Sequence, residues 1–478
     1  MSELLPEYSS LDGLALGELV RRRAVSPSEL LEAAIARAGR LNPTLNAIVR
    51  RFDDLARGLA ATASTSTGPF AGVPFLLKDI GGEMEGVATR YGSAFVPEFP
   101  SPADITLVAR YKAAGLVPFG KTNVSEFGLP PMAEARLYGP ARNPWNPERT
   151  PGGSSGGAAA AVAAGIVPLA HASDGGGSIR IPASCCGVVG LKPTRGRLSY
   201  APGGDHMNGM TVEHVVSRSV RDSAAALDAT AGPVPGDPYA APYQSRPFLE
   251  EVSTPPARPL RIALSVEVPS MSVHPDCVAA VQRAAALCAD LGHAVEEANP
   301  GLTPELVGEP FVAVYSAGLA AGIDRVASLT GQQPSPDVLE AITWNFYEIG
   351  RRVTGSGYLN AIWALQGLSR LFAAFFEKYD VWLTPTCGTP PLEVGAVDFL
   401  APGADVRDPR IQRFVLANPL YNLSGQPAIS LPLHWNAAGL PIGTTFGARF
   451  GGEATLFQLA GQLEAAAPWT GRRPPVHA

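Results

Sequence analysis

The pattern of apolar and polar positions changes character near residue 66. Over residues 1–65, apolar residues recur at helical spacing after Ser26-Pro-Ser-Glu29, a capping box with proline at the first helical position. From Val73 onward, short apolar strands alternate with helices, beginning with the strand VPFLL at 73–77 and a helix over about 104–114. This alternation predicts an α/β fold over residues 66–478, with residues 1–65 as an N-terminal helical layer of the same domain.

Two segments interrupt the alternation. A proline-rich stretch over 232–260 predicts a surface crossing. Residues 303–377 follow a mostly helical pattern rich in aromatic side chains, which predicts a helical insertion. The other apolar runs predict strands at 116–119, 166–170, 260–265 and 293–298, and buried strands at 380–386, 427–433 and 441–448. Helices are predicted after Ser155, after Ser219, over 276–291 and over 453–465.

Composition narrows the classes of protein. The chain has 478 residues, of which 46% are hydrophobic and 17% charged, a balance typical of globular domains. Its 37 basic and 43 acidic residues give a net charge of −6 without a long basic run, so we expect no contact with nucleic acid. Five cysteines form neither a disulfide framework nor a paired metal motif, which favours a reducing, cytoplasmic compartment. We see no secretory signal and no apolar run of about 18 residues, so we expect no membrane segment.

The segment from Gly115 to Thr122 matches the phosphate-loop pattern GxxxxGK[ST] of nucleotide-binding proteins. Such a loop needs a strand before its first glycine and a helix that begins at its lysine. Here a helix is predicted before Gly115, the strand-like LVPF fills the loop, and Pro118 removes a backbone donor. We therefore expect a helix that ends at Gly115 and is followed by a strand.

Gly152-Gly-Ser-Ser-Gly156 matches GxSxG, the nucleophile turn of α/β-hydrolases, in which Ser154 would be the nucleophile of a histidine-dependent esterase. That chemistry needs a histidine well downstream, and only His434 comes late enough in the chain. We expect His434 to be an exposed residue at the end of a strand, so the esterase remains an alternative hypothesis.

Candidate chemistry is concentrated between Thr150 and Gly196, where two glycine-flanked serines, Ser154 and Ser178, are found. The three glycines before Ser178 let the backbone approach a ligand closely, and their N–H groups could converge on a developing oxyanion. A helix beginning at Ser178 would add its positive end. A structural turn would also explain the glycines, but not the second serine cluster.

Lys78 follows the apolar run at 73–77, which predicts that its ammonium group enters a poorly solvated interior. Burial lowers the pKa of a lysine because it disfavours the charged form, and a neutral lysine can accept a proton through an intervening hydroxyl. A lysine paired with the neighbouring Asp79 is the alternative.

Together these segments resemble the amidase signature family over about residues 72–463. The resemblance rests on motifs in the family's order and spacing: VPFLLKD (73–79), GKTNVSEFG (120–128), NPWN (143–146), GGSSGG (152–157) and SDGGGSIRIPASCCGVVGLKPTRG (173–196). It implies a large, mixed, twisted β-sheet sandwiched between α-helices. It also implies a Ser-cis-Ser-Lys triad, with Ser178 as nucleophile, Ser154 as the bridging serine in a cis peptide and Lys78 as base. The backbone amides of Gly175, Gly176, Gly177 and Ser178 resemble the family's oxyanion hole, and its supporting residues fall on Ser155, Asp174 and Arg180.

Within the family, the chain is most similar to the 6-aminohexanoate cyclic dimer hydrolase branch, through ARNPWN, GVVGLKPTRGR, NLSGQPAISLPL and the terminal PW-x-x-RRP. Two departures concern the substrate pocket. Gly175 stands where other members usually carry a bulkier residue, and Gly128 stands where some members place a larger one. Composition and place in the chain add Trp344 and Tyr347 as further pocket candidates.

These features predict an amidase that hydrolyses small to medium apolar amides through a seryl acyl-enzyme, with no metal ion and no other cofactor. Aryl amides, esters, carbamates (urethanes) and nylon-type oligomers are candidate substrates, and a homodimer is a possible assembly. The alternative function is the glutaminase subunit of an amidotransferase, which shares the signature and acts with a partner protein. The aromatic stretch at 344–376 favours an apolar ligand over glutamine.

Overall fold

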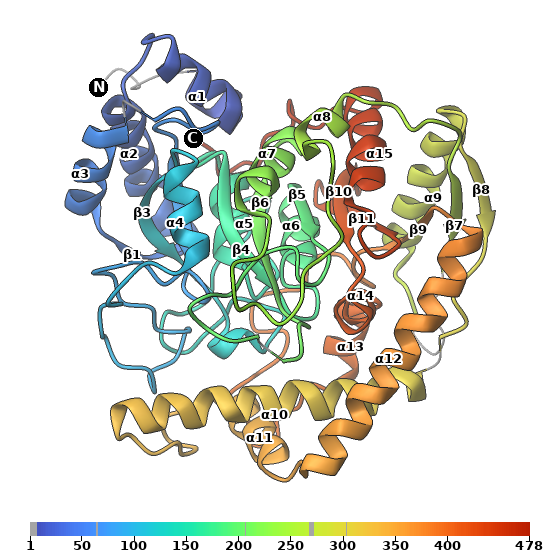
Figure 1. Ribbon diagram of the computed structural model, residues 1–478. Helices are drawn as coiled ribbons and strands as arrows, with labels where there is room; N and C mark the ends of the chain where they lie inside the picture. Colours follow the sequence, from blue (N-terminus) through green and yellow to red (C-terminus); the bar gives the residue numbers. More distant parts are fainter. Residues whose placement is uncertain (1–6, 64–65, 206, 267–271, 303) are drawn as a thin grey trace.

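The computed structural model describes residues 7–63, 66–205, 207–266, 272–302 and 304–478. At its centre lies an eight-stranded sheet (Figure 1). Neighbouring strands from β4 to β9 run antiparallel, whereas β9, β7 and β8 run parallel, so the sheet is mixed. In order across the sheet the strands are β4 (Leu169–Asp174), β6 (Val212–Ser217), β5 (Val189–Lys192), β10 (Ala428–Trp435), β11 (Pro441–Ala448), β9 (Val381–Pro385), β7 (Arg261–Leu264) and β8 (Ala294–Glu297).

A second, three-stranded sheet has the order β1 (Ile48–Arg51), β3 (Val117–Thr122) and β2 (Pro74–Lys78). Strand β2 is buried along its whole length, as its apolar sequence predicts, and it packs against β4. The backbone N–H of Lys78 donates to Nδ1 of His171 on β4, at 3.2 Å. This contact fixes the end of β2 beside the strand that leads into the glycine-rich loop.

Helices pack against the large sheet. Helix α5 (Gly156–Ala163) packs on β4 and β6, and helix α7 (Val220–Thr230) packs on β6 and β5. Helices α6 (Arg180–Cys186) and α15 (Glu453–Ala466) pack on β10 and β11. Every residue of α5 is buried, because its glycines and alanines allow a close approach to the strands. The predicted fold class, a mixed sheet covered by helices, is confirmed. Other helices of the described residues are η1 (Tyr8–Ser10), α4 (Thr106–Ala113), η2 (Glu126–Gly128), α8 (Phe248–Val252), α9 (Pro275–Asp290), α13 (Pro409–Val415) and α14 (Asn418–Ser424).

The N-terminal layer contains the predicted helices α1 (Gly13–Arg21), α2 (Pro27–Leu45) and α3 (Asp53–Ala63). The Ser26–Glu29 capping box is present at the start of α2. The expectation that residues 1–65 are wholly helical is wrong, because β1 lies between α2 and α3 and pairs with β3. Residues 1–6 and 64–65 of this segment lie outside the described residues.

The proline-rich crossing at 232–260 contains one short helix, α8. At the start of α8, the backbone N–H groups of Phe248 and Leu249 donate hydrogen bonds to the carboxylate of Asp228. After the crossing, β7 and β8 join the large sheet, as the alternation predicts. Strands β5 and β6 were not predicted, although both belong to the same sheet.

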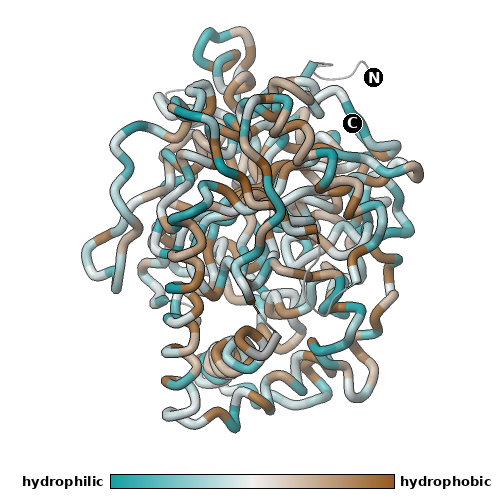
Figure 2. The backbone as a smooth tube through the Cα atoms, turned by 90° about the vertical axis from the view of Figure 1, so that its right-hand side faces the viewer, coloured by the Kyte–Doolittle hydropathy of each residue, from teal (hydrophilic) through white to brown (hydrophobic). Residues whose placement is uncertain are grey.

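The predicted helical insertion consists of α10 (Pro304–Thr330), α11 (Ala341–Arg351) and α12 (Gly355–Lys378). Figure 1 shows α10 along the lower edge of the molecule and α12 rising from one end of it. Two of these helical segments are long and apolar enough to cross a membrane, by length and composition alone: Leu306–Thr330 and Gly355–Lys378. The sequence pattern did not predict this. Helices α10 and α12 pack on each other and on α14, and α10 also packs on α11. Figure 2 shows hydrophilic and hydrophobic residues interspersed along the backbone throughout this view of the molecule.

Candidate active site

Lys78 is the last residue of β2, and its side chain is fully buried. Its Nζ lies 2.8 Å from Ser154 Oγ and 2.7 Å from Ser173 Oγ, and it also donates to the Ser173 carbonyl oxygen at 3.4 Å. Two of these three contacts come from one residue on β4. The amine is therefore held between the glycine-serine loop that carries Ser154 and the end of β4.

Burial lowers the pKa of Lys78 from 10.5 to about 8, although Glu213 and Asp174 favour its charged form. Asp79, the alternative partner, points elsewhere: its carboxylate accepts hydrogen bonds from the backbone N–H of Arg90 and from the hydroxyl of Tyr138. A substantial fraction of Lys78 is thus neutral near pH 8 and able to accept a proton.

Ser154 lies in the loop before α5, and the Gly153–Ser154 peptide bond is cis. Ser154 is only 2% exposed. Next to it, Ser155 Oγ donates to the Ser173 carbonyl oxygen at 3.2 Å, and its backbone N–H donates to the carbonyl oxygen of Ser178 at 3.3 Å. Ser155 therefore connects the three segments that carry Ser154, Ser173 and Ser178.

The loop from Asp174 to Ser178 is held by the side chain of Asp174 at the end of β4. Its carboxylate accepts hydrogen bonds from the backbone N–H groups of Gly177 (2.7 Å) and Ile179 (3.1 Å). Arg180 forms a two-pronged ion pair with it, at 3.0 and 2.9 Å. Burial alone would raise the pKa of Asp174, but the charge and hydrogen bonds of Arg180 hold it well below its usual range. Asp174 and Arg180 thus hold the shape of the loop.

Two details of the loop differ from the sequence expectations. Helix α6 begins at Arg180, two residues after Ser178, because the Asp174 carboxylate occupies the N–H groups at its entry. The N–H of Gly177 is one of these groups, so it is not free to donate to an oxyanion. The backbone amides of Gly175, Gly176 and Ser178 make no hydrogen bond to the described residues and stay candidates for that role.

Asn422, on α14, completes this arrangement and was not predicted from the sequence. Its Nδ2 donates to Oδ1 and to the carbonyl oxygen of Asp174, both at 2.9 Å, and to the carbonyl oxygen of Met210. Its Oδ1 accepts from Nη2 of Arg180 at 2.7 Å. Asn422 belongs to the NLSGQPAISLPL motif, but nothing in the motif indicated a contact with a loop almost 250 residues earlier. Ser173, by contrast, stands in the serine-glycine run and could have been chosen from it.

Gly128 is the one predicted pocket residue that the structure brings to the serines. A Cβ atom at Gly128 would lie 3.3 Å from Ser154 Oγ and 3.3 Å from Cδ1 of Ile80. Trp344 and Tyr347 on α11 contact each other, with ring centroids 5.5 Å apart, and the Tyr347 hydroxyl donates to Asp324 on α10. These contacts hold α10 and α11 together and do not reach the serines.

Two aromatic residues of α10 lie at the glycine loop instead. A Cβ atom at Gly176 would lie 3.7 Å from Cζ of Phe311, and one at Gly175 would lie 3.3 Å from Cε2 of Tyr315. The two rings pack on each other, with centroids 5.2 Å apart. Periodicity gave no sign of which aromatic residues of the insertion face the loop. The space left by Gly175 is thus already filled by Tyr315.

The histidines of the described residues serve other purposes than serine activation. His171 accepts the N–H of Lys78 at Nδ1, and its Nε2 lies 2.9 Å from Glu213. His214 Nε2 pairs with Ser223 Oγ, and His434 is half-buried near the end of β10 rather than exposed. Among the described residues Ser154 Oγ is bonded to Lys78 and not to a histidine. His206 lies outside the described residues.

The phosphate-loop match is excluded by its conformation. Its glycine, lysine and threonine at 120–122 form the end of strand β3, and Nζ of Lys121 donates inward to the carbonyl oxygen of Gly82 and to Oγ1 of Thr89. Such a buried strand leaves no cradle of N–H groups for a phosphate. Within the described ranges, no three His, Cys, Asp or Glu side chains gather as a metal site.

The whole sequence was compared with those of known protein families. The Amidase family model matches residues 29–457. The chain belongs to the amidase family. It is therefore an enzyme of the class that hydrolyses amide carbon–nitrogen bonds. This result confirms the family that the motifs indicated and excludes the α/β-hydrolase interpretation of GxSxG.

The similarity to individual relatives extends over nearly the whole chain. A 6-aminohexanoate-cyclic-dimer hydrolase of Paenarthrobacter ureafaciens is 39% identical over 483 residues, covering 97% of this chain and 96% of that protein. A solved 6-aminohexanoate cyclic dimer hydrolase in complex with substrate is 36% identical with a TM-score of 0.92, over 98% of this chain and all of that one. A bacterial aryl acylamidase is 25% identical with a TM-score of 0.88, over 97% and 99% of the two chains.

Proposed function

We propose that this amidase hydrolyses small to medium apolar amides through a seryl acyl-enzyme, with Ser178 as nucleophile, Ser154 as proton relay and Lys78 as base. The observation that carries the proposal is the fully buried amine of Lys78, 2.8 Å from Ser154 Oγ. Ser178 lies in the adjoining loop and is half-buried, whereas Ser154 and Lys78 are buried behind it. Substrate thus reaches the nucleophile, while the base stays shielded from water.

The contacts of Lys78 support a direction for the proton. A neutral amine has two N–H donors and one lone pair. When both donors face the hydroxyl and carbonyl oxygens of Ser173, the lone pair remains for the hydroxyl of Ser154. Ser154 then gives its proton to Lys78 and takes one from Ser178 as Ser178 attacks the amide carbonyl. The reverse transfer protonates the departing amine, and water hydrolyses the acyl-enzyme by the same relay.

Charge on the carbonyl oxygen develops next to the glycine loop. The amides of Gly175, Gly176 and Ser178 are the donors we propose for it, since the Gly177 amide is bound to Asp174. These N–H groups belong to a segment that the Asp174–Arg180 ion pair holds in place before substrate arrives. Such preorganised donors stabilise a transition state without a reorganisation cost.

The walls around the loop support an apolar substrate. Phe311, Ile80 and Pro419 lie against Gly176 and Gly128 and are apolar, and Tyr315 and Thr211 at Gly175 are uncharged. None of these side chains could pair with the charged ends of a glutamine, so we favour an independent amidase over an amidotransferase subunit. Aryl amides, carbamates (urethanes), esters and nylon-type oligomers fit this description. We further propose that the enzyme is cytoplasmic and acts on its small-molecule substrate without a metal ion; a homodimer is a possible assembly.

A substrate panel tests the proposal. Wild type, Ser178→Ala and the surface control Ser253→Ala would be assayed with an aryl acylanilide, an aryl carbamate, a linear aminohexanoate dimer and glutamine. We expect turnover of at least one neutral apolar amide by wild type and by the control, and none by Ser178→Ala. Turnover of glutamine alone, or of nothing without a partner protein, would instead indicate the amidotransferase subunit. Full activity of Ser178→Ala would contradict the assignment of the nucleophile.

A further inference from the structure

Two buried titratable side chains that the proposed mechanism does not use lie next to Lys78. His171 on β4 is fully buried, and Glu213 on β6 is 7% exposed. In the antiparallel register of these strands Glu213 lies opposite Ser173, and His171 precedes Ser173 by two residues on the same face. Ser173 supplies two of the contacts of the Lys78 amine. The two strands thus bring an imidazole and a carboxylate to the face on which the proposed base lies.

The hydrogen bonds of His171 determine its tautomer. Its Nδ1 accepts the backbone N–H of Lys78 at 3.2 Å, so this nitrogen carries no proton. Burial lowers the pKa of the ring to about 3, helped by the charges of Lys78 and Lys121 and opposed by that of Glu83. The ring is therefore neutral, and its one proton is on Nε2. Nε2 donates to Oε2 of Glu213, 2.9 Å away, so the contacts run from a carboxylate through a neutral ring to the main chain of Lys78.

The turn after β2 packs on the same two side chains. A Cβ atom at Gly81 would lie 2.5 Å from Oε1 of Glu213, and one at Gly82 would lie 3.1 Å from Nδ1 of His171. Gly81 also has a φ of +68°, which favours glycine. Neither position takes a larger side chain without displacing its neighbours. Close packing therefore adds to the hydrogen bond that fixes the end of β2.

Glu213 also acts on the amine of Lys78 through its charge. Burial lowers the pKa of Lys78 to about 8, and Glu213, followed by Asp174, opposes this by favouring the charged form. Asp174 is held in an ion pair with Arg180. The ring that Glu213 contacts is neutral, so this contact cancels none of its charge. Of the two carboxylates, Glu213 has the larger effect on the amine.

We propose that Glu213 and His171 form a positioning pair for the proposed base: His171 holds the main chain of Lys78, and Glu213 holds the ring and supplies a negative charge near the amine. The inference rests on the proposed role of Lys78 as base. The charge stabilises the ammonium that forms when Lys78 takes the proton of Ser154, which makes the amine a stronger base. The same charge keeps more of the amine protonated at acid pH.

Glu213→Gln tests the charge, because glutamine keeps an acceptor for Nε2 of His171. We expect the midpoint of the kcat/KM profile to fall by about one pH unit. The amine is then a weaker base that is neutral at lower pH. kcat/KM should therefore be about threefold above wild type at pH 6 and about threefold below it at pH 10. A purely structural role would lower kcat/KM at every pH.

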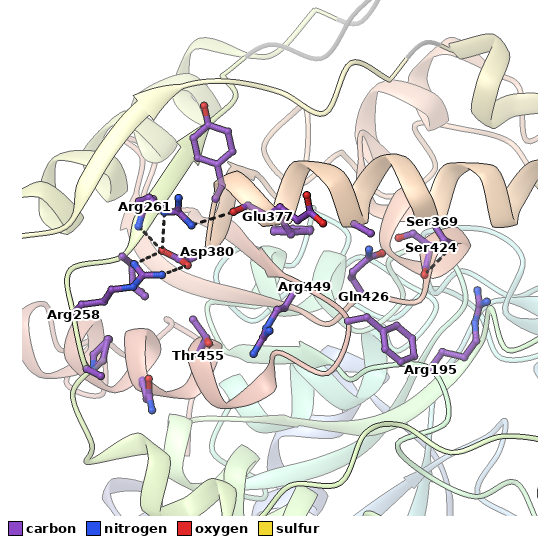
Figure 3. Close-up of a pocket in the computed structure, with 18 of the residues that line it drawn as sticks. Arg195, Arg258, Arg261, Ser369, Glu377, Asp380, Ser424, Gln426, Arg449 and Thr455 are labelled. Carbon is purple, nitrogen blue, oxygen red and sulfur yellow. Dashed lines mark hydrogen bonds and ion pairs between the residues drawn. The ribbon is translucent and has the colours of Figure 1, made fainter.

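Glu377→Gln removes the same charge elsewhere and is the matched control. Figure 3 shows Glu377, on α12, at the wall of a cavity of about 890 Å³. The described residues that line this cavity include neither the proposed triad nor the pair. The carbonyl oxygen of Glu377 accepts a hydrogen bond from Nη2 of Arg261, which the substitution leaves in place. We expect this variant to keep the wild-type profile.

Two variants of His171 test its hold on the main chain. Both lose the hydrogen bond to Glu213. The side-chain oxygen of asparagine can replace Nδ1 as acceptor for the N–H of Lys78, whereas leucine has no acceptor. We expect kcat to be at least tenfold lower in His171→Leu than in His171→Asn. Equal kcat in these two variants would overturn the role of His171.

NMR titration of lysines isotopically labelled at Nζ separates this inference from the proposed function. Lys78→Met identifies the signal of Lys78, and the titration measures its pKa whether or not the amine acts as base. We expect this pKa to fall by about one pH unit in Glu213→Gln and to stay unchanged in Glu377→Gln. No change in Glu213→Gln would overturn the pair. A fall without a matching shift in kcat/KM would uphold the pair and contradict Lys78 as the base.

Discussion

Nζ of Lys78 and Oγ of Ser173 are 2.7 Å apart, at the point where β2 lies beside β4. The backbone of the same serine accepts a second hydrogen bond from the amine. Ser173 is thus the main fixed partner of the proposed base, and Ser154 is the one through which a proton can leave. The two serines divide the work of orienting the amine and of relaying its proton.

Replacing Ser173 by alanine tests this division. The Ser173 hydroxyl accepts a hydrogen bond from the ammonium and so favours the charged form, which means that its loss lowers the pKa of Lys78 further. We expect the midpoint of the kcat/KM profile to move to lower pH by roughly one pH unit, with kcat about tenfold lower because the amine is less well oriented. Ser173→Thr keeps the hydroxyl and should stay near wild type. A midpoint that moves to higher pH would contradict the contact.

The pH profile of wild type follows from the lysine base. With a pKa of about 8, Lys78 is mostly protonated at pH 6 and mostly neutral at pH 9. We expect kcat/KM to rise about tenfold per pH unit below that value and to level off above it. Lys78→Arg supplies a permanent cation in its place and should be inactive throughout. A rise complete by pH 6.5 would indicate a histidine instead.

The same burial should make Lys78 a liability for stability. Its folded pKa of about 8 lies below the ordinary 10.5, so between these values the unfolded chain binds the extra proton. The free energy of unfolding of wild type therefore rises with pH across that window. Lys78→Met should be inactive yet more stable at pH 7 by about 1–3 kcal/mol, and the difference should shrink towards pH 10.5. Urea unfolding at pH 7 and pH 10 measures it; an unstable methionine variant at pH 7 would show that the lost hydrogen bonds outweigh the buried charge.

The parts of the site that could be predicted are those whose local sequence pattern alone determines their structure. The apolar run at 73–77 forms β2 and buries Lys78 after it, as expected from a strand with no polar face. Strand β6 was not predicted because Glu213 and His214 interrupt its apolar pattern. Both are buried, since His171 and Ser223 supply their partners from elsewhere in the chain. Such pairing across the fold cannot be predicted from one segment.

The residues of the proposed substrate pocket also depend on packing between distant segments, which the sequence of one segment does not show. Phe311 and Tyr315 lie on α10, and Trp344 and Tyr347 lie on α11. All four side chains are buried or half-buried, so burial does not distinguish them. Only the packing of α10 on the glycine loop selects Phe311 and Tyr315. Their partners, Gly175 and Gly176, lie more than 130 residues earlier in the chain. Composition could thus predict an aromatic pocket wall but not its members.

Asn422 offers a test of how the loop from Asp174 to Ser178, which carries the proposed nucleophile, keeps its shape. Asn422→Ala removes three hydrogen bonds donated by its Nδ2 and leaves Nη2 of Arg180 with one acceptor fewer. Because these groups are buried, we expect a loss of about 2–4 kcal/mol in the free energy of unfolding and at least a tenfold fall in kcat. Asn345→Ala removes a single hydrogen bond, to Ala404, and is the matched control. Loss of stability with unchanged kcat would show that the loop keeps its shape without Asn422.

A substitution at Gly128 tests how much space there is beside Ser154, the proposed proton relay. Its φ is +71°, and an added Cβ atom would lie 3.3 Å from Ser154 Oγ. Gly86 has a similar φ of +76° with nothing within 4 Å of such an atom, so Gly86→Ala carries the backbone cost alone. We expect Gly128→Ala to lower kcat/KM at least tenfold more than Gly86→Ala, at comparable loss of stability. Equal kinetics of the two variants would mean that the Ser154 hydroxyl tolerates the added atom, and would contradict the prediction.

The ring of Phe311 should set the preference for the substrate group next to the carbonyl. It lies 3.7 Å from the Cβ position of Gly176, where a proposed oxyanion donor is located, so atoms flanking a bound carbonyl must touch it. An aryl group gains an offset ring contact that an alkyl group lacks, worth about 0.5–1.5 kcal/mol. Phe311→Leu should therefore lower kcat/KM for an aryl amide about three- to tenfold relative to an alkyl amide. Trp344→Leu, on the far contact of α11 with α10, should leave that ratio unchanged. If Trp344→Leu moves the ratio and Phe311→Leu does not, the pocket wall is formed by α11, as composition alone had indicated.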